Sequence, residues 1–259
     1  MRHPPGRPIA AWAVHVYTAT GSVLGLLIVL AAIDGDVARA LWLGLVALVV
    51  DGTDGMLARR LRVKDRIPWF DGARLDDIVD YLTYAFAPVV LLLTAGFLPA
   101  GAAGTAVAAI PLLASCYQFC RVDAKTDDHL FLGFPSYWNV LALYAVALDL
   151  SPTTVAAILI ACSVLVFVPI GYVYPSRTVV LRRTTLVLTA LWVVSCAGIL
   201  LHPADPHPVW LVVSCGYVAY YVLLSVRLTV ARRRDDERSS YASRHESARA
   251  GTATSPGIE

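Results

Sequence analysis

Five aspartates between residues 51 and 80 are the side chains of this sequence best suited to chemistry. Asp51 and Asp54 are three residues apart, and Asp76 and Asp80 are four apart, so each pair falls on one face of a helix. Asp77 is expected to point elsewhere. Two facing helices that each carry such a pair would form an oxygen-rich cage. This cage suits Mg²⁺ or Mn²⁺, because these ions prefer hard oxygen ligands and commonly bind phosphates as well.

Small residues accompany the acids at helical spacing. Gly55 and Ala58 follow Asp51 on the same face and leave the backbone bare there, so that a flat ligand could lie against it. Arg59 could then hold a phosphate group. Gly72 opens similar space ahead of the second acidic pair. The structural alternative is a charge network between the acids and the neighbouring arginines, but such a network does not account for the small residues at these positions.

The acids must be positioned by apolar helices, because the composition is that of a membrane protein. Of the 259 residues, 58% are hydrophobic and 15% are charged, and the mean hydropathy is +0.65. Carboxylates at the edges of apolar runs are candidates for a functional site, since an unpaired charge in hydrocarbon is costly. The net charge of +2 is too small to indicate a nucleic-acid partner, so none is expected.

We expect an all-α fold, a polytopic integral membrane protein with about eight transmembrane helices, since apolar runs of about 20 residues can each cross a membrane. One membrane domain is predicted over residues 1–230, and a polar, disordered cytoplasmic tail is predicted over residues 231–259. The expected helices are 9–33, 38–60, 72–98, 101–120, 136–150, 153–174, 180–200 and 209–230.

The basic residues predict the orientation of these helices. Lysines and arginines gather in the even-numbered connections and at both termini, whereas the odd-numbered connections carry only Arg39. By the positive-inside rule, both termini and residues 51–80 then face the cytoplasm.

A membrane transporter for cations or protons is the alternative class of protein. It would show internal repeats and helices broken at the midplane, and the sequence has neither feature.

The pattern D-x-x-D-G-x-x-A-R, followed by G-x-x-x-D-x-x-x-D, resembles the signature of the CDP-alcohol phosphotransferases. This resemblance implies a core of six helices around a cytoplasm-facing site, where two Mn²⁺ or Mg²⁺ ions hold the diphosphate of a CDP-linked donor. An alcohol attacks the β-phosphorus and CMP leaves. The resemblance also implies residue roles: Asp51, Asp54, Asp76 and Asp80 as metal ligands, Asp80 also as the catalytic base, and Gly55, Ala58, Arg59 and Gly72 as CDP-diacylglycerol-binding residues.

The segment before Gly72 narrows the resemblance. Twelve residues separate Arg59 from Gly72, more than most family members have, and this insert resembles that of the bacterial phosphatidylcholine synthases. The segments CRVDAKTDDH and GFPSYWN resemble theirs as well. The resemblance implies CDP-diacylglycerol and choline as substrates, membrane lipids as partners, a homodimer, and the bacterial inner membrane as the location. Serine or another small alcohol is the alternative acceptor.

Aromatic residues are the candidates for binding choline, because a quaternary ammonium group cannot donate hydrogen bonds and aromatic faces commonly hold it. We select Tyr84, Tyr117 and Trp138, although any one of them could instead serve packing or an interfacial belt. An acceptor such as serine would need cationic or hydrogen-bonding residues here. The aromatic residues near the predicted cytoplasmic rim are Tyr81, Tyr84, Tyr117, Phe119, Phe134, Tyr137 and Trp138.

Overall fold

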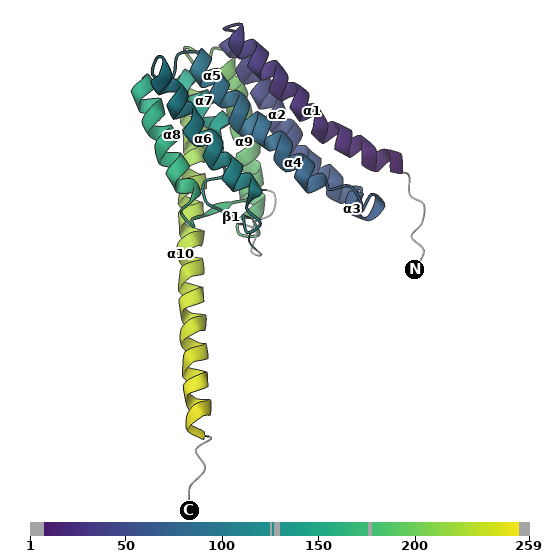
Figure 1. Ribbon diagram of the computed structural model, residues 1–259, viewed down its shortest axis with the longest axis vertical. Helices are drawn as coiled ribbons and strands as arrows, with labels where there is room; N and C mark the ends of the chain where they lie inside the picture. Colours follow the sequence, from purple (N-terminus) through teal and green to yellow (C-terminus); the bar gives the residue numbers. More distant parts are fainter. Residues whose placement is uncertain (1–7, 125, 127–129, 176–177, 254–259) are drawn as a thin grey trace, which may run out of the picture.

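The computed structural model is a bundle of helices with one small sheet (Figure 1). It describes residues 8–124, 126, 130–175 and 178–253, and it describes side chains up to residue 234. In chain order the elements are α1 (Pro8–Ile33), α2 (Val37–Arg60), α3 (Val63–Arg66), α4 (Gly72–Asp80), the π-helical turn η1 (Tyr81–Phe86), α5 (Ala87–Thr94), α6 (Ala102–Cys120), β1 (Leu130–Leu132), α7 (Trp138–Ala147), α8 (Pro152–Val166), β2 (Gly171–Val173), α9 (Arg182–Leu200) and α10 (Pro208–Ala253).

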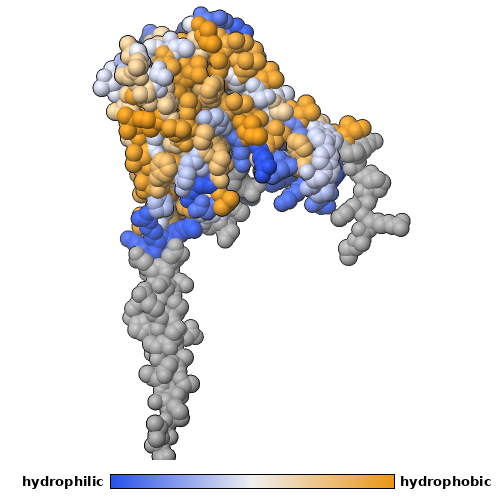
Figure 2. Space-filling view, in the orientation of Figure 1, coloured by the Kyte–Doolittle hydropathy of each residue, from blue (hydrophilic) through white to orange (hydrophobic). Residues whose placement is uncertain are grey.

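Six helices of the described chain are long and apolar enough to cross a membrane, which confirms a polytopic membrane protein. They are α1, α2, the continuous run α4–η1–α5, α6, α9 and the Pro208–Arg234 part of α10. The remaining two apolar helices, α7 and α8, are shorter. Many large apolar side chains are exposed on the bundle, as lipid-facing side chains must be, and the space-filling view shows this apolar surface (Figure 2).

Three of the expected helices end earlier than the sequence predicts, and the one expected to end at residue 150 ends at Ala147. The segment expected to run to residue 174 ends at Val166, because the chain then turns into β2. Strand β2 pairs antiparallel with β1, and this small sheet is an addition to the expected all-α fold. The run that begins at Gly72 ends at Thr94, short of residue 98. At the other end of the chain, α10 continues to Ala253 and projects from the bundle (Figure 1). This helix does not test the disorder predicted for residues 231–259, which stays a prediction.

Side chains of α10 hold β2 in place. The Thr229 hydroxyl donates to the carbonyl oxygen of Gly171 at 3.1 Å and accepts from its backbone N–H at 2.8 Å. The Ser225 hydroxyl accepts from the Val173 N–H at 3.0 Å. Backbone groups on the free edge of a buried strand need such partners, so these hydroxyls fix the sheet against α10.

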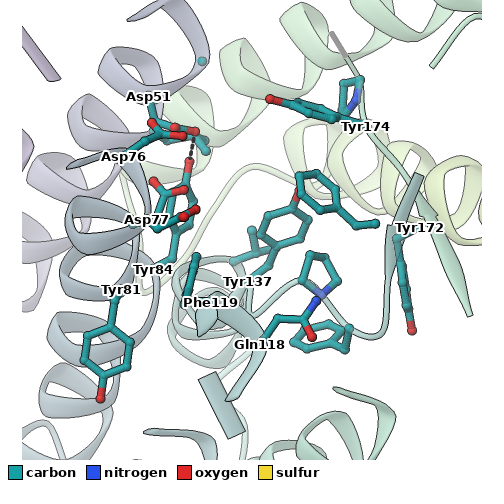
Figure 3. A pocket seen from close by; sticks show the side chains of 18 of the residues that line it. Asp51, Asp76, Asp77, Tyr81, Tyr84, Gln118, Phe119, Tyr137, Tyr172 and Tyr174 are labelled. Atoms are coloured by element: carbon teal, nitrogen blue, oxygen red, sulfur yellow. Dashed lines mark hydrogen bonds between the residues drawn. The ribbon is translucent and has the colours of Figure 1, made fainter. Parts of the chain in front are cut away.

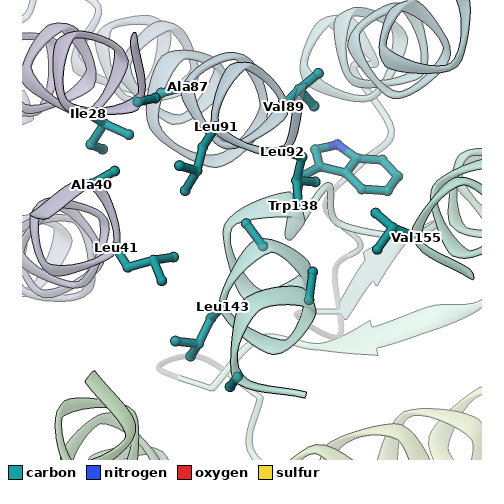
Figure 4. Packing of buried hydrophobic residues seen from close by; sticks show 14 of the residues in the cluster. Ile28, Ala40, Leu41, Ala87, Val89, Leu91, Leu92, Trp138, Leu143 and Val155 are labelled. Carbon is teal, nitrogen blue, oxygen red and sulfur yellow. The ribbon is translucent and has the colours of Figure 1, made fainter. Parts of the chain in front are cut away.

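The buried core gathers around α7, which lies between α2, α5, α8 and α9 (Figure 4). Trp138 at the start of α7 is fully buried and belongs to the same cluster as Leu92 of α5 and Val155 of α8. Further along α7, Leu143 faces Leu41 of α2. This packing sets α7 and the loop before it rigidly within the bundle.

Helix α1 packs directly against the run α4–η1. A Cβ atom added at Gly21 would lie 2.4 Å from the Cγ1 atom of Val79, and one added at Gly25 would lie 3.4 Å from the Cβ atom of Leu82. Small residues permit this close approach, as they commonly do between membrane helices. The contact fixes the helix that carries the second acidic pair.

Candidate functional site

A large cavity opens inside the bundle, with a volume of about 1590 Å³. Its walls come from α2, α4, η1, α6, β1, the loop before α7, α7, α8, β2, α9 and α10. Carboxylates line one side and tyrosines line the other (Figure 3). The cavity therefore joins the acidic residues singled out in the sequence to an aromatic wall that comes from distant parts of the chain.

Three of the four predicted metal ligands meet in this cavity. One carboxylate oxygen from each of Asp51, Asp76 and Asp80 lies within 4.8 Å of the other two. Helix α2 supplies the first residue and α4 the other two, as the helical spacing predicts. All three residues are half-buried. Clustered carboxylate oxygens are the donors that Mg²⁺ and Mn²⁺ prefer, so the residues fit a divalent ion.

The start of α4 is fixed by Asp71, which precedes the helix. Its Oδ1 atom accepts from the backbone N–H groups of Ala73 and Arg74 at 3.2 and 3.1 Å. An aspartate at this position satisfies N–H groups that a helix otherwise leaves without partners. Because the helix begins here, Asp76 and Asp80 come one turn apart on the face that α4 presents to the cavity. Asp77 borders the cavity as well, so the expectation that it points elsewhere is wrong (Figure 3).

Asp54 lies apart from the three clustered carboxylates. It is 5% exposed, and its Oδ2 atom accepts from the Thr18 hydroxyl of α1 at 2.7 Å. Nearby, the hydroxyls of Tyr17 and Thr53 are hydrogen-bonded at 2.8 Å. Asp54 still borders the cavity, and its predicted role as a metal ligand stays a prediction. Thr18 is one of several polar residues in this part of α1, with Tyr17, Thr20 and Ser22, so the sequence does not single it out as the partner.

Tyr84 bonds to the acidic cluster. Its hydroxyl donates to the Oδ2 atom of Asp51 at 2.6 Å, which is the dashed line in Figure 3. Such a bond to a carboxylate is stronger than one between neutral groups and fixes its orientation. The sequence predicts Tyr84 as a choline-binding residue and does not predict this contact, although Tyr84 lies one helical turn beyond Asp80.

The widened turn η1 places Tyr84 next to the acids. Pro88 cannot donate a hydrogen bond to the carbonyl oxygen of Tyr84, four residues before it, because proline has no N–H. A π-helical turn spanning Tyr81–Phe86 lies immediately before this point. Such turns occur frequently at functional sites, and this one directly follows Asp80.

The predicted nucleotide-binding residues divide into two groups. Gly55 and Arg59 border the cavity, and an added Cβ at Gly55 would lie 3.2 Å from the Nη1 atom of Arg59. Ala58 packs instead against a cluster of buried residues from α1 and α3. A Cβ at Gly72 would lie 2.7 Å from the Cε1 atom of His15. Neither Ala58 nor Gly72 borders the cavity, so packing explains both, and their ligand-binding role stays a prediction.

Two of the three aromatic residues chosen for choline lie away from the cavity wall. Tyr117 is 46% exposed and packs against Phe167 with ring centroids 4.8 Å apart. Trp138 is fully buried, and its Nε1 atom donates to the Ser115 hydroxyl at 2.7 Å. These placements argue against the predicted role of both residues. Tyrosines that the choice passed over border the cavity instead: Tyr137, Tyr172, Tyr174, Tyr217 and Tyr221.

An ion pair marks the rim of the site where α6 ends. The Nε atom of Arg121 lies 2.8 Å from the Oδ1 atom of Asp123. The hydrogen bond from Arg121 lowers the pKa of the Asp123 carboxyl, so this carboxylate is charged at neutral pH. The same bond raises the pKa of Arg121. Arg121 borders the cavity, and Asp123 offsets its positive charge through this ion pair.

No protein-family model matches the chain. Curated relatives do match it over most of its length. The phosphatidylcholine synthase of Legionella pneumophila is 40% identical over 223 residues, which cover 83% of this chain and 87% of the relative. The phosphatidylcholine synthase of Pseudomonas aeruginosa is 40% identical over 82% of this chain and 89% of its own. That of Rhizobium meliloti is 34% identical over 85% and 91%.

The spanning helices and the carboxylates shared by α2 and α4 define a polytopic membrane protein of the CDP-alcohol phosphotransferase class. Identity of this level over more than four-fifths of the chain narrows the class further. The chain belongs to the phosphatidylcholine synthase family.

Proposed function

We propose that this enzyme transfers the phosphatidyl group of CDP-diacylglycerol to choline, giving phosphatidylcholine and CMP. The observation that carries this assignment is the meeting of Asp51, Asp76 and Asp80 in a cavity that also has an aromatic wall. The similarity to named phosphatidylcholine synthases supports the same substrates. The cavity, at about 1590 Å³, has room for a lipid-linked nucleotide beside a small alcohol.

Each residue of the acidic side has a part in binding the donor. Asp51, Asp76 and Asp80 would hold Mn²⁺ or Mg²⁺, with Asp54 as a further ligand and two ions as the expected number. When bound, these ions neutralise the diphosphate and stabilise the leaving CMP. Tyr84 keeps Asp51 oriented through its hydrogen bond. Arg59 borders the cavity and binds a phosphate oxygen of the donor.

Asp80 is the proposed general base. Its carboxylate takes the proton from the choline hydroxyl as the choline oxygen attacks the β-phosphorus of the donor. A bond forms between that oxygen and phosphorus, the bond from phosphorus to the CMP oxygen breaks, and CMP leaves with the electron pair. Asp80 comes from the same helix face as Asp76, so a bound donor and the base lie on one side of the cavity.

We propose that the site and both termini face the cytoplasm, in the inner membrane of a bacterium. The hydrophilic surface of the molecule gathers along one edge, from α3 and α4 to the point where α10 leaves the bundle (Figure 2). This edge contains Arg62 and Lys64 near α3 and Arg232 on α10. The positive-inside rule assigns such an edge to the cytoplasm.

The resemblance also implies a homodimer, and light scattering in detergent would measure the oligomeric state.

Product formation in membranes tests the proposal. Membranes that contain the protein are given labelled choline, CDP-diacylglycerol and Mn²⁺, and the lipids are separated. Labelled phosphatidylcholine is expected, with CMP released in equal amount. A parallel reaction with labelled serine is expected to label no lipid beyond the level of membranes without the protein. Absence of labelled phosphatidylcholine, or equal labelling from serine, would contradict the proposal.

A further inference from the structure

We propose that the rings of Tyr137 and Tyr221 bind the quaternary ammonium group of choline and thereby set the acceptor specificity of the enzyme. This inference rests on the proposed function and names residues that replace the candidates Tyr117 and Trp138. Tyr137 comes from the loop before α7, and Tyr221 comes from α10. Both border the cavity that contains the carboxylates.

The tyrosines form a continuous aromatic wall that begins at the acids. The ring centroids of Tyr84 and Tyr137 are 6.0 Å apart, and those of Tyr137 and Tyr221 are 6.3 Å apart. The ring of Tyr172 lies 6.4 Å beyond that of Tyr221. In Figure 3, Tyr137 occupies the middle of the wall, between Tyr84 and the residues of β2. Several rings at these distances can face one cation, whose optimal separation from a centroid is within about 6 Å.

Charge divides the cavity sharply into two halves. Every charged side chain among its described lining residues falls between Asp51 and Arg121 of the sequence. The lining residues from Phe131 onward include tyrosines, aliphatic residues, prolines and a threonine, but none of them is charged. Among the described lining residues, this half offers no cationic side chain to pair with the carboxylate of serine. It suits a quaternary ammonium group, which needs aromatic faces and no hydrogen-bond acceptor.

The size of choline requires its ammonium site to be next to the base. Only two carbon atoms separate the choline hydroxyl from the nitrogen, so both ends must bind within a short distance. Tyr84 donates to Asp51, and the ring of Tyr137 is the next ring of the wall. Tyr137 is therefore one ring beyond the tyrosine that contacts the acidic cluster, and this neighbourhood supports it as the binding residue for the ammonium group.

Neighbouring contacts hold both rings in place. Ser136, immediately before Tyr137, has a left-handed backbone with φ of 59° and is fully buried. The Ser115 hydroxyl donates to that of Ser136 at 3.0 Å and accepts from Trp138. A left-handed conformation is uncommon for serine and persists only where the surroundings enforce it. Tyr221 is fixed from the other side, because its hydroxyl donates to the Val173 carbonyl oxygen at 3.1 Å.

Steady-state kinetics of paired variants test the assignment. Tyr137→Leu and Tyr221→Leu should each raise the KM for choline about tenfold, since each removes a cation–π contact in a desolvated site. Tyr137→Phe keeps the ring and should change this KM by less than about threefold. Tyr221→Phe keeps the ring but loses the hydrogen bond to Val173, so it should raise this KM less than Tyr221→Leu does. The KM for CDP-diacylglycerol should stay the same in all four, which reports a folded donor site. Tyr220→Leu is the matched control, because Tyr220 is adjacent on α10 and bonds to Thr185 instead of bordering the cavity.

A neutral analogue separates charge recognition from shape. The tert-butyl analogue of choline has carbon in place of the ammonium nitrogen. The wild type should prefer choline to this analogue at least about tenfold, and the Leu variants should lose most of that preference. An unchanged choline KM, or an unchanged preference, in both Leu variants would overturn the inference. These results can be obtained only if the wild type makes phosphatidylcholine. If the proposed function itself is wrong, the wild type will make none, so the two failures can be told apart.

Discussion

At the scale of single residues, Tyr84 joins the two halves of the site. Its hydroxyl donates to Asp51, and its ring begins the wall that leads to Tyr137. One residue therefore orients a carboxylate and borders the path of the acceptor. In this arrangement the acids bind the donor and accept a proton, and the tyrosines select the acceptor.

The base assignment makes the sharpest prediction at this scale. Asp80→Asn should lower turnover at least about 100-fold, the typical contribution of a positioned general base. The variant should still bind CDP-diacylglycerol, measured by equilibrium binding of the labelled lipid in detergent, because Asp51 and Asp76 remain. Turnover within a few-fold of the wild type would show that Asp80 is not the base.

Loss of the Tyr84 hydroxyl should weaken the metal site. Tyr84→Phe removes a hydrogen bond to a carboxylate, worth about 1.5 kcal/mol or more, so the Mn²⁺ concentration for half-maximal activity should rise about tenfold. The titration needs Tyr117→Phe as its control, since Tyr117 has the same chemistry but lies off the cavity. Equal titration curves for Tyr84→Phe and the wild type would rule out an orienting role.

At the scale of elements, the sequence predicted the helices well and the connections poorly. The apolar runs marked helices such as α1 and α9 to within a few residues, because a helix in lipid must satisfy its backbone internally over a fixed length. The strands β1 and β2 are only three residues each, too short for an alternating pattern. They pair residues about 40 positions apart, a separation that no local signal reveals.

The choice of Trp138 over Tyr137 has the same cause. The two residues are adjacent where the loop meets α7, and nothing in their spacing indicates which one turns inward to the core. The left-handed backbone of Ser136 and the packing of Trp138 decide it. Likewise, helical spacing was enough to predict that Asp51, Asp76 and Asp80 lie together. The hydrogen bond between Asp54 and Thr18 depends on how α1 packs against α2, which spacing does not reveal.

Close packing of α1 on α4 predicts a stability effect. Gly21→Ala should lower the stability by about 1–3 kcal/mol, because the added Cβ would overlap Val79. Gly44→Ala on α2 is the matched control, since nothing lies within 4 Å of a Cβ there. Alanine favours helix by up to about 1 kcal/mol over glycine, so this control should be neutral or stabilised. Thermal unfolding in detergent measures both, and equal melting temperatures would contradict the packing described.

The loop that carries Tyr137 depends on Gly133. This residue has φ of 81°, and an added Cβ would lie 2.1 Å from the Val166 carbonyl oxygen. Gly133→Ala should raise the KM for choline and lower the melting temperature. Gly96→Ala shares the strain of a positive φ, at 79°, but meets nothing within 4 Å. The difference between the two variants isolates the contact with α8, and identical behaviour would show that the contact is unimportant.

At the scale of the whole molecule, the chemistry lies at one end of the bundle. The acidic cluster, the basic segment around α3 and the exit of α10 share this end, and apolar surface covers much of the bundle between this end and the opposite one on the face that Figure 2 shows (Figures 1 and 2). A donor with two acyl chains can then keep its tails in the membrane while its diphosphate reaches the carboxylates. Choline, which is water-soluble, enters from the same aqueous side.

Reporter fusions test this one-sided arrangement. Green fluorescent protein fused after Glu259 should fluoresce, because that reporter folds in the cytoplasm. Alkaline phosphatase inserted after Gly35, in the turn between α1 and α2, should be active, because the basic residues assign that turn to the opposite side. The reverse pattern of activities would contradict the proposed orientation.

The most direct test of the account is the metal dependence of phosphatidylcholine formation by the purified protein. The enzyme is first treated with EDTA and then titrated with Mn²⁺ in the presence of labelled choline and CDP-diacylglycerol. The account predicts no labelled phosphatidylcholine after EDTA and restored synthesis with Mn²⁺, with Asp76→Asn restored poorly even at high concentration. Synthesis that continues without a divalent ion, or full activity of Asp76→Asn, would contradict it.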